Sequence, residues 1–349
     1  MIRVLIVDDS AVFRQVLARE LSKANDIEVV GTAMDPYVAR DKILSLKPDV
    51  LTLDLEMPRM DGLTFLNKLM RYHPLPIIVV SSLTAGGSHL ALEAMEQGAV
   101  DVVCKPGSGF SASELCENLI AKIRIAAQAH CVKHEANHSG LVGARKTVLP
   151  RLGKTTHKIL AIGASTGGTE AIHRVLQQLP VDTPGTLIVQ HMPECFTTSF
   201  AERLNAQCQM KVQEAKKDDL VVSGLALLAP GDFHLTLKRN GANYYVDVKS
   251  GTPVHHQRPS VDVLFQSVAK HAGQNAVGVI LTGMGVDGAA GLLAMRKAGA
   301  HTLAQDEDSC IVFGMPKEAI RRKAVDEVVS LADMPSAIMA SLSAKIITT

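Results

Sequence analysis

Residues 1–10 form the segment Met1-Ile2-Arg3-Val4-Leu5-Ile6-Val7-Asp8-Asp9-Ser10, a short apolar run that ends on two consecutive carboxylates. Four further short apolar runs follow, at residues 28–32, 50–53, 77–80 and 100–104. The segments between them space their apolar residues as amphipathic helices do. Strands that alternate with helices are typical of a parallel sheet covered on both faces. The sequence therefore predicts a five-strand, doubly wound α/β domain over residues 1–129.

Charged and hydroxyl side chains stand where these predicted strands end. Asp8 and Asp9 follow the first strand, Asp54 ends the third, Ser81 ends the fourth and Lys105 follows the fifth. Because the carboxyl ends of parallel strands meet at one edge of a sheet, we expect these groups to share a crevice. Three clustered carboxylates repel one another and favour a hard divalent cation, for which Mg²⁺ is suited.

A plainer interpretation treats each of these aspartates as a helix N-cap, a role that Ser10 and Asp61 could also fill. It explains the residues one at a time, but it does not explain why acidic, hydroxyl and ammonium groups all fall at strand ends of one sheet. We therefore favour a functional site.

The same residues, with the segments Leu53-Asp54-Leu55-Glu56-Met57-Pro58 and Lys105-Pro106, resemble the receiver domain of two-component response regulators. The resemblance implies that Asp54 accepts a phosphoryl group from a histidine kinase. It further implies that Asp8 and Asp9 hold Mg²⁺ together with Asp54, and that Ser81 and Lys105 contact the phosphoryl group. Val102 stands where receivers often carry an aromatic residue.

Residues 130–157 lose the periodicity and are interpreted as a linker. Three histidines at a spacing of four, His130, His134 and His138, leave a helical metal site open as an alternative there. From residue 158 to 349 the alternation of strands and helices resumes, with a predicted antiparallel hairpin at residues 234–238 and 244–248. The sequence predicts a second doubly wound parallel-sheet domain that carries this hairpin.

The second domain places a nucleophile candidate after its first strand. Residues 163–167 match G-x-S-x-G, which puts Ser165 on a tight strand-to-helix turn near a helix N-terminus. A dinucleotide-binding turn is an alternative, but it requires an acidic residue at the end of the next strand. That position holds Gln190 and His191 instead. The sequence thus favours a hydrolase over a dehydrogenase.

A third strand, at residues 277–281, leads into a glycine-rich loop that ends at Asp287. Ser165, His191 and Asp287 would supply a nucleophile, a general base and an orienting carboxylate from three strand ends of one sheet. The backbone amide of Met284, between two glycines, could stabilise an oxyanion. Asp287 could alternatively cap the helix that follows it.

The arrangement resembles the chemotaxis response-regulator protein-glutamate methylesterases, the CheB-type proteins, over nearly the whole chain. Matching segments include Ala161-Ile162-Gly163-Ala164-Ser165-Thr166-Gly167-Gly168, Gln190-His191-Met192-Pro193, Arg258-Pro259-Ser260-Val261-Asp262 and Gly283-Met284-Gly285. The resemblance implies that the second domain removes methyl esters from glutamates of chemoreceptors and deamidates receptor glutamines, and that it needs no cofactor. Val286 stands where this family often has asparagine, and the pair His255-His256 is interpreted as a loop without a metal.

Composition excludes several other classes of protein. The 349 residues exceed one ordinary domain, and 47% hydrophobic against 20% charged residues rules out a disordered chain. A formal charge of +1 and only 3% aromatic residues argue against nucleic-acid binding. No apolar run is long enough for a signal peptide or a membrane span, so we expect a cytoplasmic protein without membrane insertion. A phosphorylation-dependent adaptor and a nucleotide-binding protein remain the rival functions.

Overall fold

The computed structural model describes residues 1–82, 84–105, 112–129 and 158–343. The chain divides into two compact units, Met1–Ala144 and Arg145–Thr349. The predicted linker and its three histidines lie outside the described residues, as does Pro106. Among the helices that the structure describes, none combines the length and the apolar character that a bilayer crossing requires.

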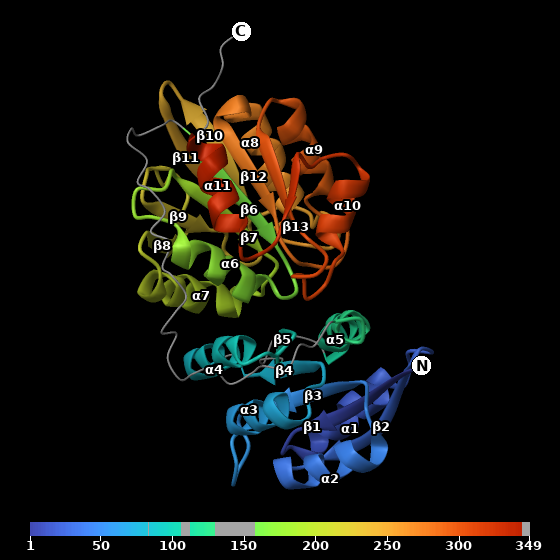
Figure 1. The fold of residues 1–349 in the computed structure, drawn as a ribbon. Helices are drawn as coiled ribbons and strands as arrows, with labels where there is room; N and C mark the ends of the chain where they lie inside the picture. Colours follow the sequence, from blue (N-terminus) through green and yellow to red (C-terminus); the bar gives the residue numbers. More distant parts are fainter. Residues whose placement is uncertain (83, 106–111, 130–157, 344–349) are drawn as a thin grey trace. The chain divides into compact units, whose positions relative to one another are not determined.

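The first unit is the predicted five-strand α/β domain (Figure 1). Its strands pair in parallel in the order β2-β1-β3-β4-β5. Every residue of β3 and β4 is buried, as expected for strands covered on both faces. The elements are β1 (Ile2–Val7), α1 (Ala11–Leu21), β2 (Ile27–Ala33), α2 (Pro36–Leu46), β3 (Val50–Asp54), α3 (Gly62–Tyr72), β4 (Ile77–Ser81), α4 (Ala85–Glu96), β5 (Asp101–Cys104) and α5 (Ala112–Ala126).

The second unit is built on a seven-stranded parallel sheet in the order β14-β13-β12-β6-β7-β9-β8. Its strands are β6 (Ile159–Ala164), β7 (Thr186–Gln190), β8 (Lys211–Glu214), β9 (Leu225–Leu228), β12 (Ala276–Ile280), β13 (His301–Gln305) and β14 (Glu327–Val329). Its helices are α6 (Gly168–Gln178), α7 (Glu194–Gln207), α8 (Val261–His271), the 3₁₀ helix η1 (Gly273–Asn275), α9 (Ala289–Lys297), α10 (Met315–Arg321) and α11 (Met334–Ser343). The predicted fold class is confirmed for both units.

The predicted hairpin is present as the antiparallel pair β10 (His234–Asn240) and β11 (Asn243–Lys249). The strands extend further toward the turn than predicted, because Asn240 pairs with Asn243. Only Gly241 and Ala242 remain as the connection, and Gly241 adopts a positive φ of 58° that suits a two-residue turn. Buried residues of the hairpin, Leu235, Leu237 and Val246 among them, belong to the hydrophobic core of the unit.

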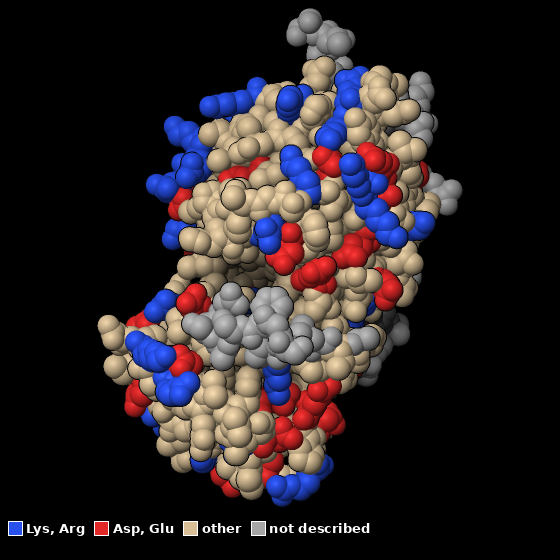
Figure 2. Space-filling view, turned by 180° about the vertical axis from the view of Figure 1, so that it is seen from behind, with Lys and Arg blue, Asp and Glu red and all other residues tan. Residues whose placement is uncertain are grey.

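Charged side chains of both signs occur on each unit in the face drawn in Figure 2. This mixture agrees with the formal net charge of +1. On that face, Lys and Arg do not form the uninterrupted basic surface that nucleic-acid binding favours.

Three adjacent strands, β12, β6 and β7, carry the candidate second-unit site at their carboxyl ends. Helix α8 begins against this edge because Gly163, near the end of β6, has no side chain. A Cβ atom on Gly163 would lie 2.2 Å from a methyl carbon of Val261 and 3.2 Å from the Phe265 ring. The absence of a side chain at residue 163 therefore sets how closely the N-terminus of α8 approaches the sheet.

We expect the substitution Gly163→Ala to displace the start of α8. The folded state of this helix should lose about 1–3 kcal/mol of stability, the usual cost of overpacking. Hydrogen exchange of the α8 amides in the full-length protein, measured by mass spectrometry in increasing urea, reports this loss. Gly86→Ala is the control, because its Cβ would have no neighbour closer than 4.0 Å. Unchanged α8 protection in Gly163→Ala would contradict the close approach.

Candidate active site

The first unit brings Asp8, Asp54 and Lys105 into direct contact. Lys105 Nζ lies 2.8 Å from Asp8 Oδ2 and 2.7 Å from Asp54 Oδ2. Both carboxylates are buried, whereas Asp9 is exposed. The lysine bridges the ends of β1 and β3 from the end of β5, so the ends of these three strands meet at one edge of the sheet.

The N-cap interpretation does not describe these aspartates. Ser10 caps α1 by accepting a hydrogen bond from Phe13 N, and Asp61 caps α3 by accepting one from Thr64 N. Asp8 instead accepts from the backbone N–H of Ser10 at 2.8 Å. Asp8 and Asp54 are therefore not the N-caps of the helices that follow them, α1 and α3.

Burial and the neighbouring charges affect the pKa values of Asp54 and Lys105. Burial raises the pKa of Asp54, and the neighbouring Asp8 carboxylate adds to the rise against the opposing effect of Lys105. For Lys105, burial acts to lower its pKa, but hydrogen bonds to Asp54 and Asp8 outweigh it and raise the pKa overall. One oxygen each of Asp8, Asp9 and Asp54 lies within 4.8 Å of the others. This all-oxygen set fits a partly hydrated Mg²⁺.

Ser81 lies at the predicted strand end but outside this contact network. It is buried, and its hydroxyl donates a hydrogen bond to the Gly87 carbonyl at 2.9 Å. Val102, which stands where an aromatic residue is common in receivers, is buried within β5.

In the second unit, the turn after β6 holds Ser165 against the end of β12. Ser165 N donates to Thr282 O at 3.0 Å, and the Ser165 carbonyl accepts from Gly168 N at 2.7 Å. Gly167 has a φ of 77°, which makes the sharp turn into α6 possible. A Cβ on Gly283 would lie 2.6 Å from Ser165 Cβ, so the Gly283 backbone passes directly beside the nucleophile candidate. Ser165 itself is partly exposed.

His191 stands next to this turn, because its N–H donates to Ala164 O at 3.1 Å. Its Nε2 lies 2.8 Å from Asp287 Oδ2, which brings together the residues after β7 and β12. Its Nδ1 is buried and has no hydrogen-bond partner among the residues that the structure describes. An ionised carboxylate only accepts, so the proton of a neutral His191 belongs on Nε2 and the lone pair on Nδ1.

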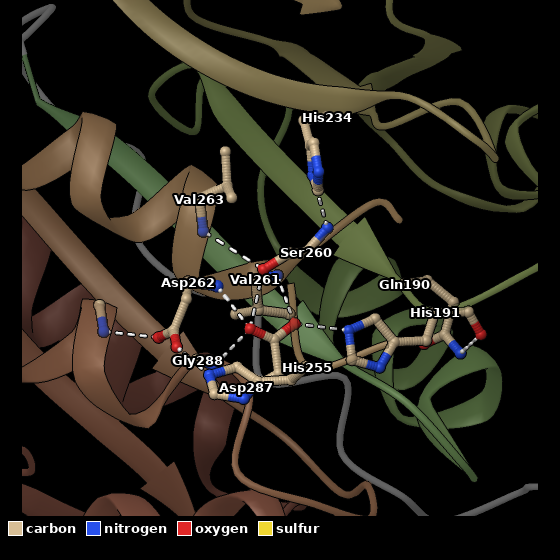
Figure 3. A network of polar contacts seen from close by, with 11 residues as sticks. Gln190, His191, His234, His255, Ser260, Val261, Asp262, Val263, Asp287 and Gly288 are labelled. Carbon is tan, nitrogen blue, oxygen red and sulfur yellow. Dashed lines mark hydrogen bonds and ion pairs between the residues drawn. The ribbon is translucent and has the colours of Figure 1, made fainter. Parts of the chain in front are cut away.

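Asp287 does not cap the helix that follows it; it accepts hydrogen bonds from the N-terminus of a different helix, α8 (Figure 3). Gly288 occupies the N-cap position of α9. The donors to the two carboxylate oxygens, besides His191, are Ser260 Oγ at 2.8 Å, Val261 N at 2.8 Å, Asp262 N at 3.0 Å and Gly288 N at 3.0 Å.

These donors decide the charge of Asp287. Burial alone would raise its pKa, but the hydrogen bond and charge of His191 and the amides of Asp262 and Val261 outweigh burial and hold the pKa below its usual value. The positive end of the α8 dipole acts in the same direction. Asp287 is therefore ionised at neutral pH.

Two groups beside the Ser165–His191 pair were not assigned from the sequence. The Gln190 side chain donates from Nε2 to Ser165 O at 2.8 Å and to His191 O at 3.3 Å, linking the backbones of both residues. The N-terminus of α8 is the other; Ser260 before an apolar run is an N-cap signal, but it does not reveal that the helix faces Asp287. In the described part of the chain, no hydrogen bond joins Ser165 Oγ to His191. Such contacts often tighten only when substrate binds.

The Met284 amide, predicted as an oxyanion donor, lies on the loop beside Ser165. Its N–H has no backbone acceptor within the described ranges, and the following Gly285 has a φ of 97°. The Met284 side chain is exposed. This N–H is therefore available to donate a hydrogen bond to a ligand oxygen.

Comparisons with known proteins cover both units. A family model described as CheB methylesterase matches residues 160–338, and one described as response regulator receiver domain matches residues 4–119. A protein-glutamate methylesterase/protein-glutamine glutaminase 2 of Syntrophus aciditrophicus (strain SB) is 60% identical over 95% of this chain and 96% of its own length. The protein-glutamate methylesterase/protein-glutamine glutaminase of Escherichia coli (strain K12) is 54% identical over 98% of this chain and 97% of its own.

A solved structure agrees with the second unit. The crystal structure of the Thermotoga maritima CheB methylesterase catalytic domain matches with a TM-score of 0.51 and 35% identity, covering 52% of this chain and 97% of its own. Together with the family models and the full-length relatives, this match shows that the chain belongs to the CheB methylesterase family and carries a response regulator receiver domain in its N-terminal unit.

Proposed function

We propose that the protein is a phosphorylation-regulated protein-glutamate methylesterase that acts on methylated chemoreceptors in the cytoplasm and also deamidates receptor glutamines. The names of relatives at 54–60% identity support the substrate class. The observation that carries the chemistry is the 2.8 Å contact between His191 and an ionised Asp287, directly beside Ser165.

Acylation begins at the Ser165 hydroxyl. Asp287 accepts a hydrogen bond from His191 Nε2–H, which leaves the Nδ1 lone pair to take the Ser165 proton. Ser165 Oγ forms a bond to the ester carbonyl carbon of the methylated glutamate. The tetrahedral intermediate then breaks its bond to the methoxy oxygen, which receives the proton from His191 and leaves as methanol. With a glutamine side chain, the same step expels ammonia.

Deacylation reverses the proton path. Nδ1 of His191 takes a proton from water as the water oxygen attacks the acyl carbon, and the bond to Ser165 Oγ breaks. The proton returns to Ser165, and a free glutamate carboxylate is released. In both steps the Met284 N–H would donate a hydrogen bond to the developing oxyanion. A single donor of this kind typically stabilises a transition state by about 3–4 kcal/mol.

Regulation rests on the first unit. Asp54 would accept a phosphoryl group from a histidine kinase, with Asp8, Asp9 and Asp54 holding Mg²⁺, whose charge offsets that of the phosphoryl oxygens. Lys105, already in contact with Asp54, would pair with the phosphoryl group. Ser81 would have to release the Gly87 carbonyl before its hydroxyl could contact the same group.

Replacing Ser165→Ala removes the nucleophile and should lower methanol release by about 10³-fold or more. The measurement is methanol released from membranes that carry methylated chemoreceptors. Ser223→Ala is the matched control, because Ser223 is an exposed serine of the same unit whose hydroxyl bonds the Asp182 carbonyl. Methanol release that persists in Ser165→Ala would contradict the nucleophile assignment. Absence of release from the unchanged protein would favour an adaptor without chemistry.

Replacing Asp54→Asn should abolish activation by a phosphodonor, because an amide does not accept a phosphoryl group. We expect acetyl phosphate with Mg²⁺ to raise the methanol release of the unchanged protein, and a tenfold rise corresponds to about 1.4 kcal/mol. Asp61→Asn, which keeps an N-cap residue on α3, should respond as the unchanged protein does. Equal stimulation of the Asp54→Asn protein would place phosphorylation elsewhere.

A further inference from the structure

A second imidazole–carboxylate pair lies beside Asp287. His255 Nε2 is 3.2 Å from Asp262 Oδ2, and Asp262 Oδ1 accepts a hydrogen bond from Gly291 N at 2.6 Å. One ligand atom each of His255, Asp262 and Asp287 lies within 4.8 Å of the others. Figure 3 shows both pairs meeting at the start of α8.

Asp262 and Asp287 are like charges that share one helix N-terminus. Both are only 2% exposed, and Asp262 N donates to Asp287 Oδ1. Burial raises the pKa of Asp262, and the charge of Asp287 adds to the rise, whereas His255 opposes it. The His255 imidazole, with Nε2 at 3.2 Å from Asp262 Oδ2, is in place to pair with this carboxylate.

The cluster is not suited to a metal ion. Asp287 Oδ1 already accepts from Ser260, Asp262 and Gly288, and its Oδ2 accepts from Val261 and His191. These bonds occupy the lone pairs that a metal would require. Asp287 is therefore not a fellow ligand of a metal ion. It is a group on which His255 acts electrostatically.

The loop is built to hold His255 at this position. His255 and its neighbour His256 both have left-handed backbone conformations, with φ values of 52° and 62°. Such conformations are uncommon for residues other than glycine and persist where the surrounding structure enforces them. Val254 and Gln257 exchange two backbone hydrogen bonds, of 3.0 and 2.9 Å, across the pair. His255 remains 42% exposed, so its ring can exchange protons with solvent.

We infer that His255 is an electrostatic positioning residue of the proposed esterase: by pairing with Asp262, it limits the negative charge beside the Asp287–His191 pair. The inference rests on the proposed function. The other titratable groups nearby either contact partners other than Asp262 or are exposed. His234 accepts from Ser260 N and contacts Thr252 O, Arg258 is bound to Gly251 O and Asp232, and His256 is exposed.

The consequence concerns the protonation of His191. Without His255, the unpaired Asp262 carboxylate stabilises the imidazolium form of His191, which cannot act as a base. The acid limb of the kcat/KM profile should then move to higher pH, by about half a pH unit. Removing the Asp262 charge should move the limb the opposite way and should cancel most of the effect of His255.

The test compares the pH dependence of kcat/KM for full-length His255→Asn, Asp262→Asn, the double variant and His256→Asn. Asparagine tolerates a left-handed backbone, and it keeps an acceptor for Gly291 N at position 262. His256→Asn is the matched control and should leave the limb in place, because His256 shares the backbone conformation of His255 without its partner. Thermal melts verify that each variant is folded.

An upward shift in His255→Asn that is absent in the Asp262→Asn background supports the inference. If the acid limb does not shift in a folded His255→Asn protein, the inference about His255 is wrong, but the proposed esterase function still stands. If the unchanged protein releases no methanol, the proposed function fails separately. The pKa of His191, followed by NMR in the unchanged and His255→Asn proteins, then decides the inference alone: a rise supports it, and no change overturns it.

Discussion

The buried carboxylate of Asp287 is the group on which the second unit depends. It is 2% exposed and ionised, a combination that the N-terminus of α8 makes tolerable through the Ser260 hydroxyl and two backbone amides. A buried charge without such donors would cost several kcal/mol. Because the same carboxylate accepts from His191 Nε2, it fixes helix α8, the loop after β12 and His191 relative to one another.

The sheet supplies the rest of the geometry. Ser165, His191 and Asp287 are far apart in the sequence, but they follow β6, β7 and β12, which are neighbours in the parallel sheet. Their chain order is therefore of no consequence for the chemistry. Because Gly163 and Gly283 carry no side chain, α8 packs closely on β6 and the β12 loop packs closely on the turn that holds Ser165. In the first unit, Lys105, Asp8 and Asp54 likewise meet at the carboxyl ends of parallel strands.

Much of this was predictable from the sequence, because its signals are local. Apolar runs and helical spacing predicted both sheets, and the rule that ligands bind at carboxyl ends of parallel strands selected the residues of both sites. Contacts that do not follow from a shared edge of strand ends were not predictable. Ser260 signals a helix start, but nothing local shows that the helix faces Asp287. The roles of Gln190 and His255 depend likewise on which backbone or carboxylate lies opposite. A strand-end position also does not specify that the Ser81 hydroxyl donates to the Gly87 carbonyl.

If Asp287 accepts a hydrogen bond from His191, it fixes the tautomer of the imidazole, which ¹⁵N NMR of the histidine ring nitrogens detects. In the full-length protein at a pH where His191 is neutral, we expect an N–H resonance for Nε2 and an unprotonated nitrogen for Nδ1. The His191 signals are assigned by their loss in His191→Gln. A proton found on Nδ1, with Nε2 bare, would mean that Asp287 does not accept from His191 and would contradict the proposed proton path.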